Sequence, residues 1–167
     1  QVMQGRAQIG IVGCTSVDDY QNNIIRKHEL TRADKEQDRI NHVDYCDANT
    51  GPIFLTYRAD MYIGMRVLGY MERKEPIYDF TSEDGISHMV WVIDEGNVIR
   101  ELCGRFENIE NLYIADGHHR CASAVRVGER RRGEGEYDKS AEFNFFLSVI
   151  FPCDQLKIMD YNRVIAD

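Results

Sequence analysis

Residues 112–124 read LYIADGHHRCASA, and this stretch decides the fold class. The first four residues are apolar or aromatic and predict a buried strand. Gly117 follows at once, and from Cys121 the spacing of small and apolar residues predicts a helix that continues to Arg131. A strand that runs directly into a helix through a glycine places residues 116–120 at the start of that helix.

A helix start of this kind is suited to binding an anion. Its backbone N–H groups carry partial positive charge, Gly117 allows a ligand to approach the backbone closely, and Arg120 offers a planar set of donors for phosphate oxygens. Asp116 would repel a phosphate, so at this position it is useful if it holds magnesium or handles a proton. The simple alternative is that Asp116 only caps the helix.

His118 and His119 are adjacent and do not share one face of a helix. A two-histidine metal site of the i, i+4 kind is therefore not expected from this pair. For each histidine taken alone, the ordinary alternative is a partly buried ring whose nitrogens are hydrogen-bonded.

The rest of the sequence alternates between strand and helix patterns. Ser16 is expected to cap a helix that runs to about residue 28, and a second helix is expected to start at Thr31. We expect a mixed α+β fold in one domain, residues 1–167, with an exposed loop at residues 130–139. The other expected elements are strands at 7–12, 53–57, 112–115, 143–151 and 157–161, helices at 61–71 and 98–106, and an antiparallel hairpin of 77–80 with 88–93.

Composition restricts the function classes. The 167 residues carry a formal net charge of -8, which argues against a broad nucleic-acid surface because such surfaces depend on clustered Lys and Arg. No stretch resembles a membrane span or a signal peptide, so a cytoplasmic location is expected. The five scattered cysteines are expected to be reduced and mostly buried. The abrupt ends at Gln1 and Asp167 suggest an internal piece of a longer protein.

A second candidate segment lies between the first two expected helices. Lys27, His28, Glu29 and Arg32 place cations, an imidazole and a carboxylate in one short junction. Functional side chains concentrate in such connections, although a solvated, charged surface explains the segment equally well.

The stretch around residues 114–124 resembles the nucleotide-phosphate loop of the ParB/sulfiredoxin superfamily. With residues 27–32, 49–55 and 160–163, nearly the whole chain resembles the middle of a longer bacterial family of unknown function. Within the superfamily, free serine kinases have the same Asp-Gly-His-His-Arg loop and a His-Glu pair upstream. The resemblance implies a ParB/sulfiredoxin-like mixed sheet with surrounding helices.

The resemblance also implies residue roles. Glu29, Asp116 and His119 would be catalytic, with Glu29 orienting the attacking hydroxyl and Asp116 binding Mg²⁺ or assisting the proton. ATP or ADP would be held by Gly117, His118, His119 and Arg120. The substrate, L-serine or a similar alcohol, would contact Lys27, His28 and Arg32.

Two departures from the superfamily limit the choice of function. Sulfiredoxins need a cysteine where this chain has His118, so sulfinic-acid repair is not expected. A ParB-type Gly-Glu-Arg-Arg occurs at residues 128–131, but it lies at a helix end, where no anion site forms and solvent-facing charges are expected. The resulting hypothesis is a kinase acting on free L-serine. The alternative is a regulatory module that binds CTP or ATP without phosphoryl transfer.

Overall fold

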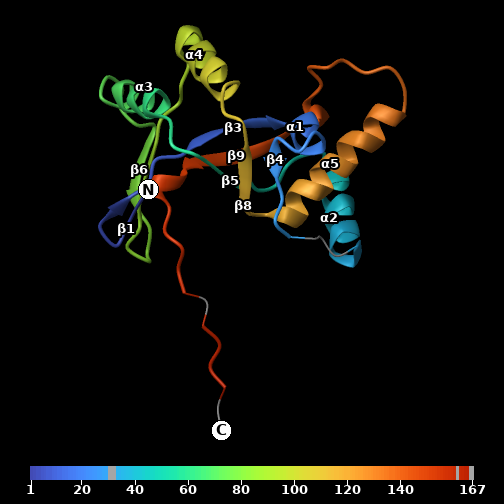
Figure 1. The fold of residues 1–167 in the computed structure, drawn as a ribbon, viewed down its shortest axis with the longest axis horizontal. Coiled ribbons are helices and arrows are strands. Elements are labelled where there is room, and N and C mark those ends of the chain that lie inside the picture. The colour runs from blue at the N-terminus through green and yellow to red at the C-terminus, as the bar shows by residue number, and fades with distance from the viewer. Residues whose placement is uncertain (30–32, 161, 166–167) are drawn as a thin grey trace.

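The computed structural model describes residues 1–29, 33–160 and 162–165. Over these residues the chain forms two β-sheets and five α-helices, so the expected α+β class is confirmed. The larger sheet occupies the centre of the molecule, and helices lie toward both of its ends (Figure 1).

The central sheet has five strands in the order β3-β9-β5-β8-β4. It is mixed, because β9 is antiparallel to β3 but parallel to β5, while β8 is antiparallel to β5 but parallel to β4. The strands are β3 (Ile11–Ser16), β4 (Ile25–Arg26), β5 (Ile53–Tyr57), β8 (Leu112–Asp116) and β9 (Phe145–Pro152).

The second sheet has four short strands in the order β2-β1-β7-β6. The predicted antiparallel hairpin is confirmed as β6 (Tyr78–Thr81) and β7 (Ser87–Val90). Gly85 turns the chain between them at φ +79°, a conformation that glycine adopts without strain. The N-terminal strands β1 (Val2–Met3) and β2 (Arg6–Ala7) complete this sheet, and the sequence did not predict them.

The five helices form two groups. Near one end of the central sheet α2 packs alongside α5, with α1 close by, whereas α3 and α4 lie toward the second sheet (Figure 1). The helices are α1 (Val17–Gln21), α2 (Ala33–Cys46), α3 (Met61–Met71), α4 (Gly96–Phe106) and α5 (His118–Gly133), and two short 3₁₀ turns occupy Glu142–Asn144 and Cys153–Gln155.

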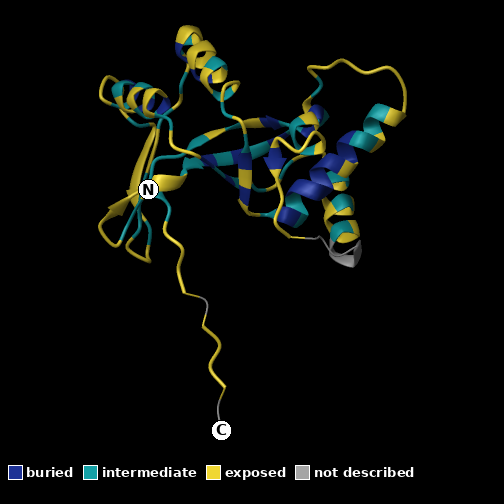
Figure 2. Ribbon diagram, in the orientation of Figure 1, coloured by how far each residue is buried: buried dark blue, intermediate teal, exposed yellow. Residues whose placement is uncertain are grey.

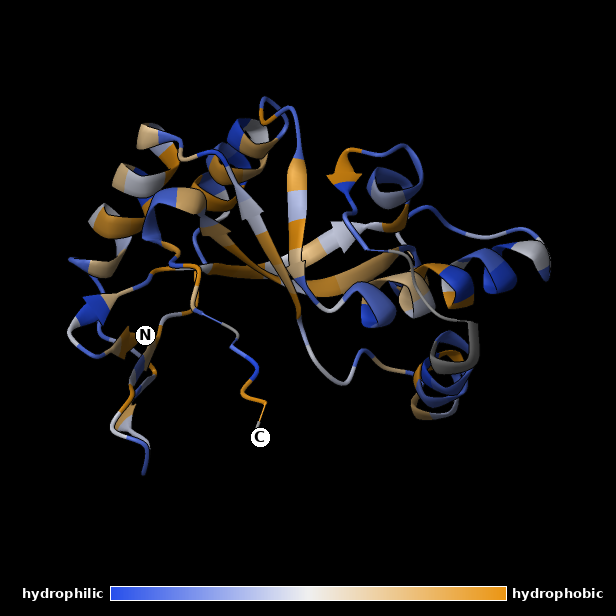
Figure 3. Ribbon diagram, turned by 60° about the horizontal axis from the view of Figure 1, so that its bottom comes forward, coloured by the Kyte–Doolittle hydropathy of each residue, from blue (hydrophilic) through white to orange (hydrophobic). Residues whose placement is uncertain are grey.

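The core lies where the central sheet meets the helices. Alternate residues of β5, Ile53, Leu55 and Tyr57, are buried, as expected for a strand covered on one face. The N-terminal half of α5 is among the most buried parts of the chain (Figure 2). The strands of the central sheet are among the most apolar parts of the chain (Figure 3). The start of α5 is therefore held firmly against the sheet.

The first helix is shorter than predicted, and this changes the position of the second candidate segment. The chain leaves α1 at Gln21, because Asn23 takes a left-handed conformation (φ +64°) that breaks the helix. Fully buried Ile25 then belongs to β4, a two-residue strand at the sheet edge. The predicted cap at Ser16 is confirmed, since its hydroxyl accepts a hydrogen bond from Asp18 N. The predicted helix start at Thr31 lies outside the described residues.

The predicted loop at residues 130–139 is partly wrong, because α5 continues to Gly133. Arg130 and Arg131 form ion pairs with Asp44 on α2, and Arg132 pairs with Asp18 of α1. The arginines at the end of α5 therefore join helices instead of only facing solvent.

Two further expectations also need correction. Residues 157–160 form no strand, and Ile158 is 98% exposed in a tail that extends away from the body (Figure 1); Tyr161 lies outside the described residues. All five cysteines are free, but only Cys121 is buried, and Cys14, Cys46, Cys103 and Cys153 are exposed.

None of the described helices is both long and apolar enough to cross a membrane.

Candidate functional site

Parallel pairing of β4 with β8 brings the two candidate segments together. Ile25 lies opposite Leu112, and Arg26 lies opposite Tyr113. Because the two strands run in the same direction, the residues that follow each of them emerge at the same edge of the sheet. Residues 27–29 therefore lie next to the junction between β8 and α5.

The junction places an open helix N-terminus at this edge. Gly117 is the N-cap of α5 in a left-handed conformation (φ +91°, ψ +29°), and within the described chain no side chain caps the helix. The first N–H groups of a helix have no partner within the helix, so those of α5 are available to a ligand. The alternative in which Asp116 caps the helix is wrong.

Asp116 instead pairs with Arg120. Its Oδ2 accepts a hydrogen bond from Arg120 Nη2 at 2.9 Å, and the two side chains are 74% and 41% exposed. An exposed pair of this kind stabilises a protein by about 0–1 kcal/mol. Arg120 can therefore turn toward a bound anion at little energetic cost.

Two glycines line the guanidinium of Arg120. A Cβ on Gly117 would lie 3.0 Å from Arg120 Nη2, and one on Gly51 would lie 3.5 Å from Nη1. The turn before β5 therefore reaches the helix start, which the sequence did not predict. A glycine that precedes a proline in a turn is a weak signal for such a close approach.

Gly117→Ala is expected to lower the free energy of unfolding by about 1–2 kcal/mol, because the left-handed conformation is unfavourable for residues with a Cβ. The added atom would also displace Arg120. Gly64→Ala is the matched control. It lies inside α3, where the new Cβ would meet no atom within 4 Å apart from its chain neighbours and the nearby backbone of its own helix, and Ala should stabilise the protein by about 0.5–1 kcal/mol. Urea unfolding measures both, and equal stability of Gly117→Ala and the wild type would contradict the assigned backbone conformation.

Glu29, His28 and His118 form a compact cluster beside the helix start. Glu29 Oε2 lies 3.7 Å from His118 Nδ1, and the rings of His28 and His118 meet edge to face with their centroids 4.4 Å apart. Burial lowers the pKa of His118 below its ordinary value of 6.5, and His28 lowers it further, while Glu29 and Asp116 act in the opposite direction. This downward shift favours the neutral form of the buried imidazole.

Neither histidine of the loop fits the ordinary structural interpretation. His118 is 6% exposed, yet its Nε2 has no hydrogen-bond partner among the described residues, and the same holds for Nδ1 of His119. His119 contributes its carbonyl, which accepts a hydrogen bond from Ser123 Oγ at 2.7 Å. Buried polar nitrogens are normally satisfied, so these two nitrogens are exceptions to that rule.

A polar cleft of about 720 Å³ lies beside this cluster, and three of the predicted residues, Lys27, His28 and Glu29, line it. The ammonium group of Lys27 sits 4.0 Å from the centre of the Tyr20 ring. The predicted contact of Arg32 lies outside the described residues. None of the other lining residues was predicted as a site residue; they are Tyr20, Gln21, Glu36, Ala122, Val125, Arg126 and Glu129.

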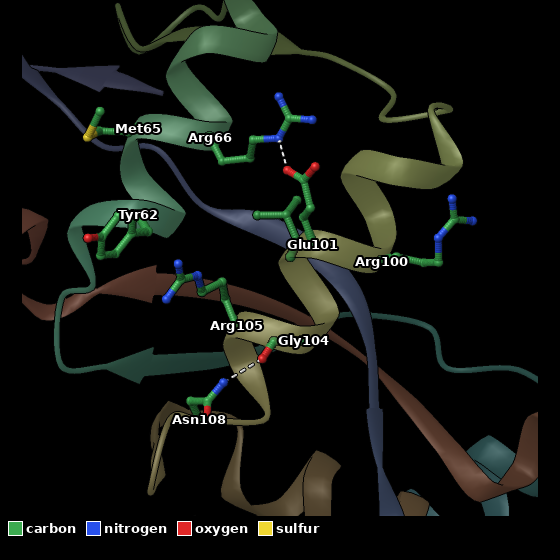
Figure 4. A pocket seen from close by; sticks show the side chains of 9 residues that line it. Tyr62, Met65, Arg66, Arg100, Glu101, Gly104, Arg105 and Asn108 are labelled. Atoms are coloured by element: carbon green, nitrogen blue, oxygen red, sulfur yellow. Dashed lines mark hydrogen bonds and ion pairs between the residues drawn. The ribbon is translucent and has the colours of Figure 1, made fainter.

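A second cleft, of about 570 Å³, lies between α3 and α4, away from the predicted site residues. Figure 4 shows Arg66 of α3 directed at Glu101 of α4, with Nε and Oε2 2.5 Å apart. Arg105 lies over the Tyr62 ring at 4.2 Å. Two of the cations that line this second cleft, Arg66 and Arg105, thus already have partners within the protein.

A family model described as a protein of unknown function, DUF1015, matches residues 1–167. The chain belongs to the DUF1015 family. No curated protein and no solved structure shows significant similarity to it. The site geometry therefore carries the functional interpretation of this DUF1015 chain.

Proposed function

We propose that the chain is a small-molecule kinase of the ParB/sulfiredoxin-like type, which transfers a phosphoryl group from ATP or ADP to the hydroxyl of free L-serine. One observation carries the proposal. Glu29 lines the polar cleft and also lies 3.7 Å from His118, the first residue of α5. A carboxylate at this junction is positioned between an acceptor in the cleft and a phosphate at the helix start.

The start of α5 supports the binding of nucleotide phosphates. It combines uncapped N–H groups at Gly117, His118 and His119 with the guanidinium of Arg120, and helix N-termini of this kind bind phosphate. His118 is buried, so its backbone would contribute rather than its ring. Arg120 would exchange its weak pair with Asp116 for charge-assisted hydrogen bonds to phosphate oxygens.

The cleft supports the acceptor. Lys27 places one positive charge in it, which suits the carboxylate of an amino acid, and His28 lies beside Glu29. In the transfer step the serine Oγ bonds to the terminal phosphorus, and the bond from that phosphorus to the bridging oxygen breaks. The nucleotide leaves with the electron pair, and Glu29 accepts the hydroxyl proton.

Asp116 fits the expected role of a magnesium ligand only in part. Its carboxylate is exposed and supplies the hard oxygen that Mg²⁺ prefers, but no second carboxylate joins it in the clusters found among the described residues. Magnesium, when bound together with the phosphates, would neutralise charge on the transferred group. Most of its ligands would then be phosphate oxygens and water.

The direct test is to incubate the protein with Mg²⁺, L-serine and ATP or ADP and to detect O-phosphoserine by mass spectrometry. Serine-dependent product is expected with at least one of the two nucleotides, and D-serine serves as the stereochemical control. Nucleotide binding without any product would contradict the kinase and favour the regulatory alternative, in which CTP or ATP controls a partner.

A further inference from the structure

Three side chains with metal-binding atoms converge at the edge of the cleft. His28, Glu29 and His118 each offer one ligand atom, and these atoms all lie within 4.8 Å of one another. The first two residues follow β4, where the chain bends at Glu29, and the third is the first residue of α5. The parallel pairing of β4 with β8 thus assembles the group from segments almost ninety positions apart.

The distance between Glu29 and His118 is close to the distance between two ligands of one metal ion. Ligands of a tetrahedral zinc ion lie about 2.0–2.1 Å from the metal and hence about 3.4 Å from each other. Glu29 Oε2 and His118 Nδ1 are 3.7 Å apart, which is too far for a hydrogen bond but near that ligand spacing. A small rotation of the exposed Glu29 side chain would close the difference.

The state of His118 supplies an independent observation. Its side chain is 6% exposed, its buried Nε2 has no hydrogen-bond partner within the described chain, and its Nδ1 is the nitrogen that Glu29 Oε2 approaches at 3.7 Å. An unpaired polar atom in the interior is unfavourable, so hydrogen bonds within the described chain do not account for the buried position of this ring. The ring of His28 packs against His118 at 4.4 Å, so a second imidazole is already in place.

We propose that His28, Glu29 and His118 form a binding site for one divalent transition-metal ion of the Zn²⁺ class. Two imidazole nitrogens and one carboxylate oxygen match the ligand set of open zinc sites, which leave a fourth position for water or another oxygen ligand. Imidazole ligands suit zinc and its neighbours and do not suit Mg²⁺. This ion is therefore distinct from the magnesium expected with the nucleotide.

The proposal is independent of the kinase, although Glu29 takes part in both. A carboxylate has two oxygens, so one can ligate the metal while the other faces the cleft. Metal binding is measured without nucleotide or serine, and its outcome does not depend on turnover. Binding without phosphoserine formation would overturn the kinase alone, and phosphoserine formation without binding would overturn the metal site alone.

The test is a titration of the metal-free protein with Zn²⁺ in competition with a chromogenic chelator. One ion per chain is expected. Because His118 is buried, the exposed positions His28 and Glu29 are replaced, and His28→Gln and Glu29→Gln are each expected to weaken binding by about 100-fold or more. His42→Gln is the matched control, since His42 is an exposed histidine that contacts Thr50, outside the cluster.

Exposed cysteines can also bind zinc, so the ligands are identified with Co²⁺. The proposed site should give the visible absorption of nitrogen and oxygen ligands without the strong near-ultraviolet band of a cobalt–thiolate bond. A thiolate band, the absence of binding by the wild-type protein, or unchanged affinity in both His28→Gln and Glu29→Gln would overturn the proposal.

Discussion

Glu29→Gln is expected to lower the rate of O-phosphoserine formation by about 10²–10⁴-fold. The amide keeps the size of the side chain but cannot accept the hydroxyl proton. Because Glu29 is largely exposed and its contact with His118 Nδ1 is 3.7 Å, its loss should change stability little. The effect should therefore appear in kcat and not in the unfolding curve.

Glu129→Gln is the matched control for this experiment. Glu129 lines the same cleft and pairs with Arg126, away from the start of α5. Its replacement should leave turnover within a few-fold of the wild type. If Glu29→Gln retained wild-type turnover, the carboxylate at the junction would have no role in proton transfer.

Arg120→Gln is expected to weaken nucleotide binding by about 10- to 100-fold. A hydrogen bond to a charged group contributes about 1.5–3 kcal/mol, and each 1.4 kcal/mol corresponds to a factor of ten in affinity. The weak pair with Asp116 subtracts little from this value, since both side chains are exposed. Calorimetric titration with ATP and ADP in the presence of Mg²⁺ measures the change.

Arg126→Gln provides the control for charge. Arg126 lies further along the same helix, where it pairs with Glu36 and Glu129. It should have a much smaller effect, because it is not at the helix start. Equal losses in both variants would mean that only the overall charge of α5 matters, and an unchanged affinity in Arg120→Gln would contradict the phosphate site.

Local sequence patterns predicted the elements whose structure depends on neighbouring residues. The predicted bounds of β5 and α3, residues 53–57 and 61–71, are confirmed, since alternation and helical periodicity are local signals. The strand before Gly117 and the helix after it are confirmed for the same reason. The predicted end of the first helix, near residue 28, was wrong. Residues 25–26 instead form β4, a strand of two residues that exists only through pairing with β8.

The candidate site was predictable only one segment at a time. The sequence identified an open helix start at Gly117 and a charged junction containing Glu29. The family resemblance implied that the two meet, but the residue patterns alone could not predict it, because it depends on a parallel pairing between distant strands. Nor did they predict the pair between Asp116 and Arg120, since the same four-residue spacing also permits a capping aspartate with a free arginine.

The most direct test of the phosphate site is a crystal structure of the protein with bound ATP or ADP. We expect phosphate oxygens within hydrogen-bond distance of the backbone N–H groups of His118 and His119 and of the Arg120 guanidinium, with Glu29 facing the terminal phosphorus. A nucleotide bound elsewhere, with Arg120 still paired to Asp116 and the start of α5 in contact only with protein or water, would contradict it.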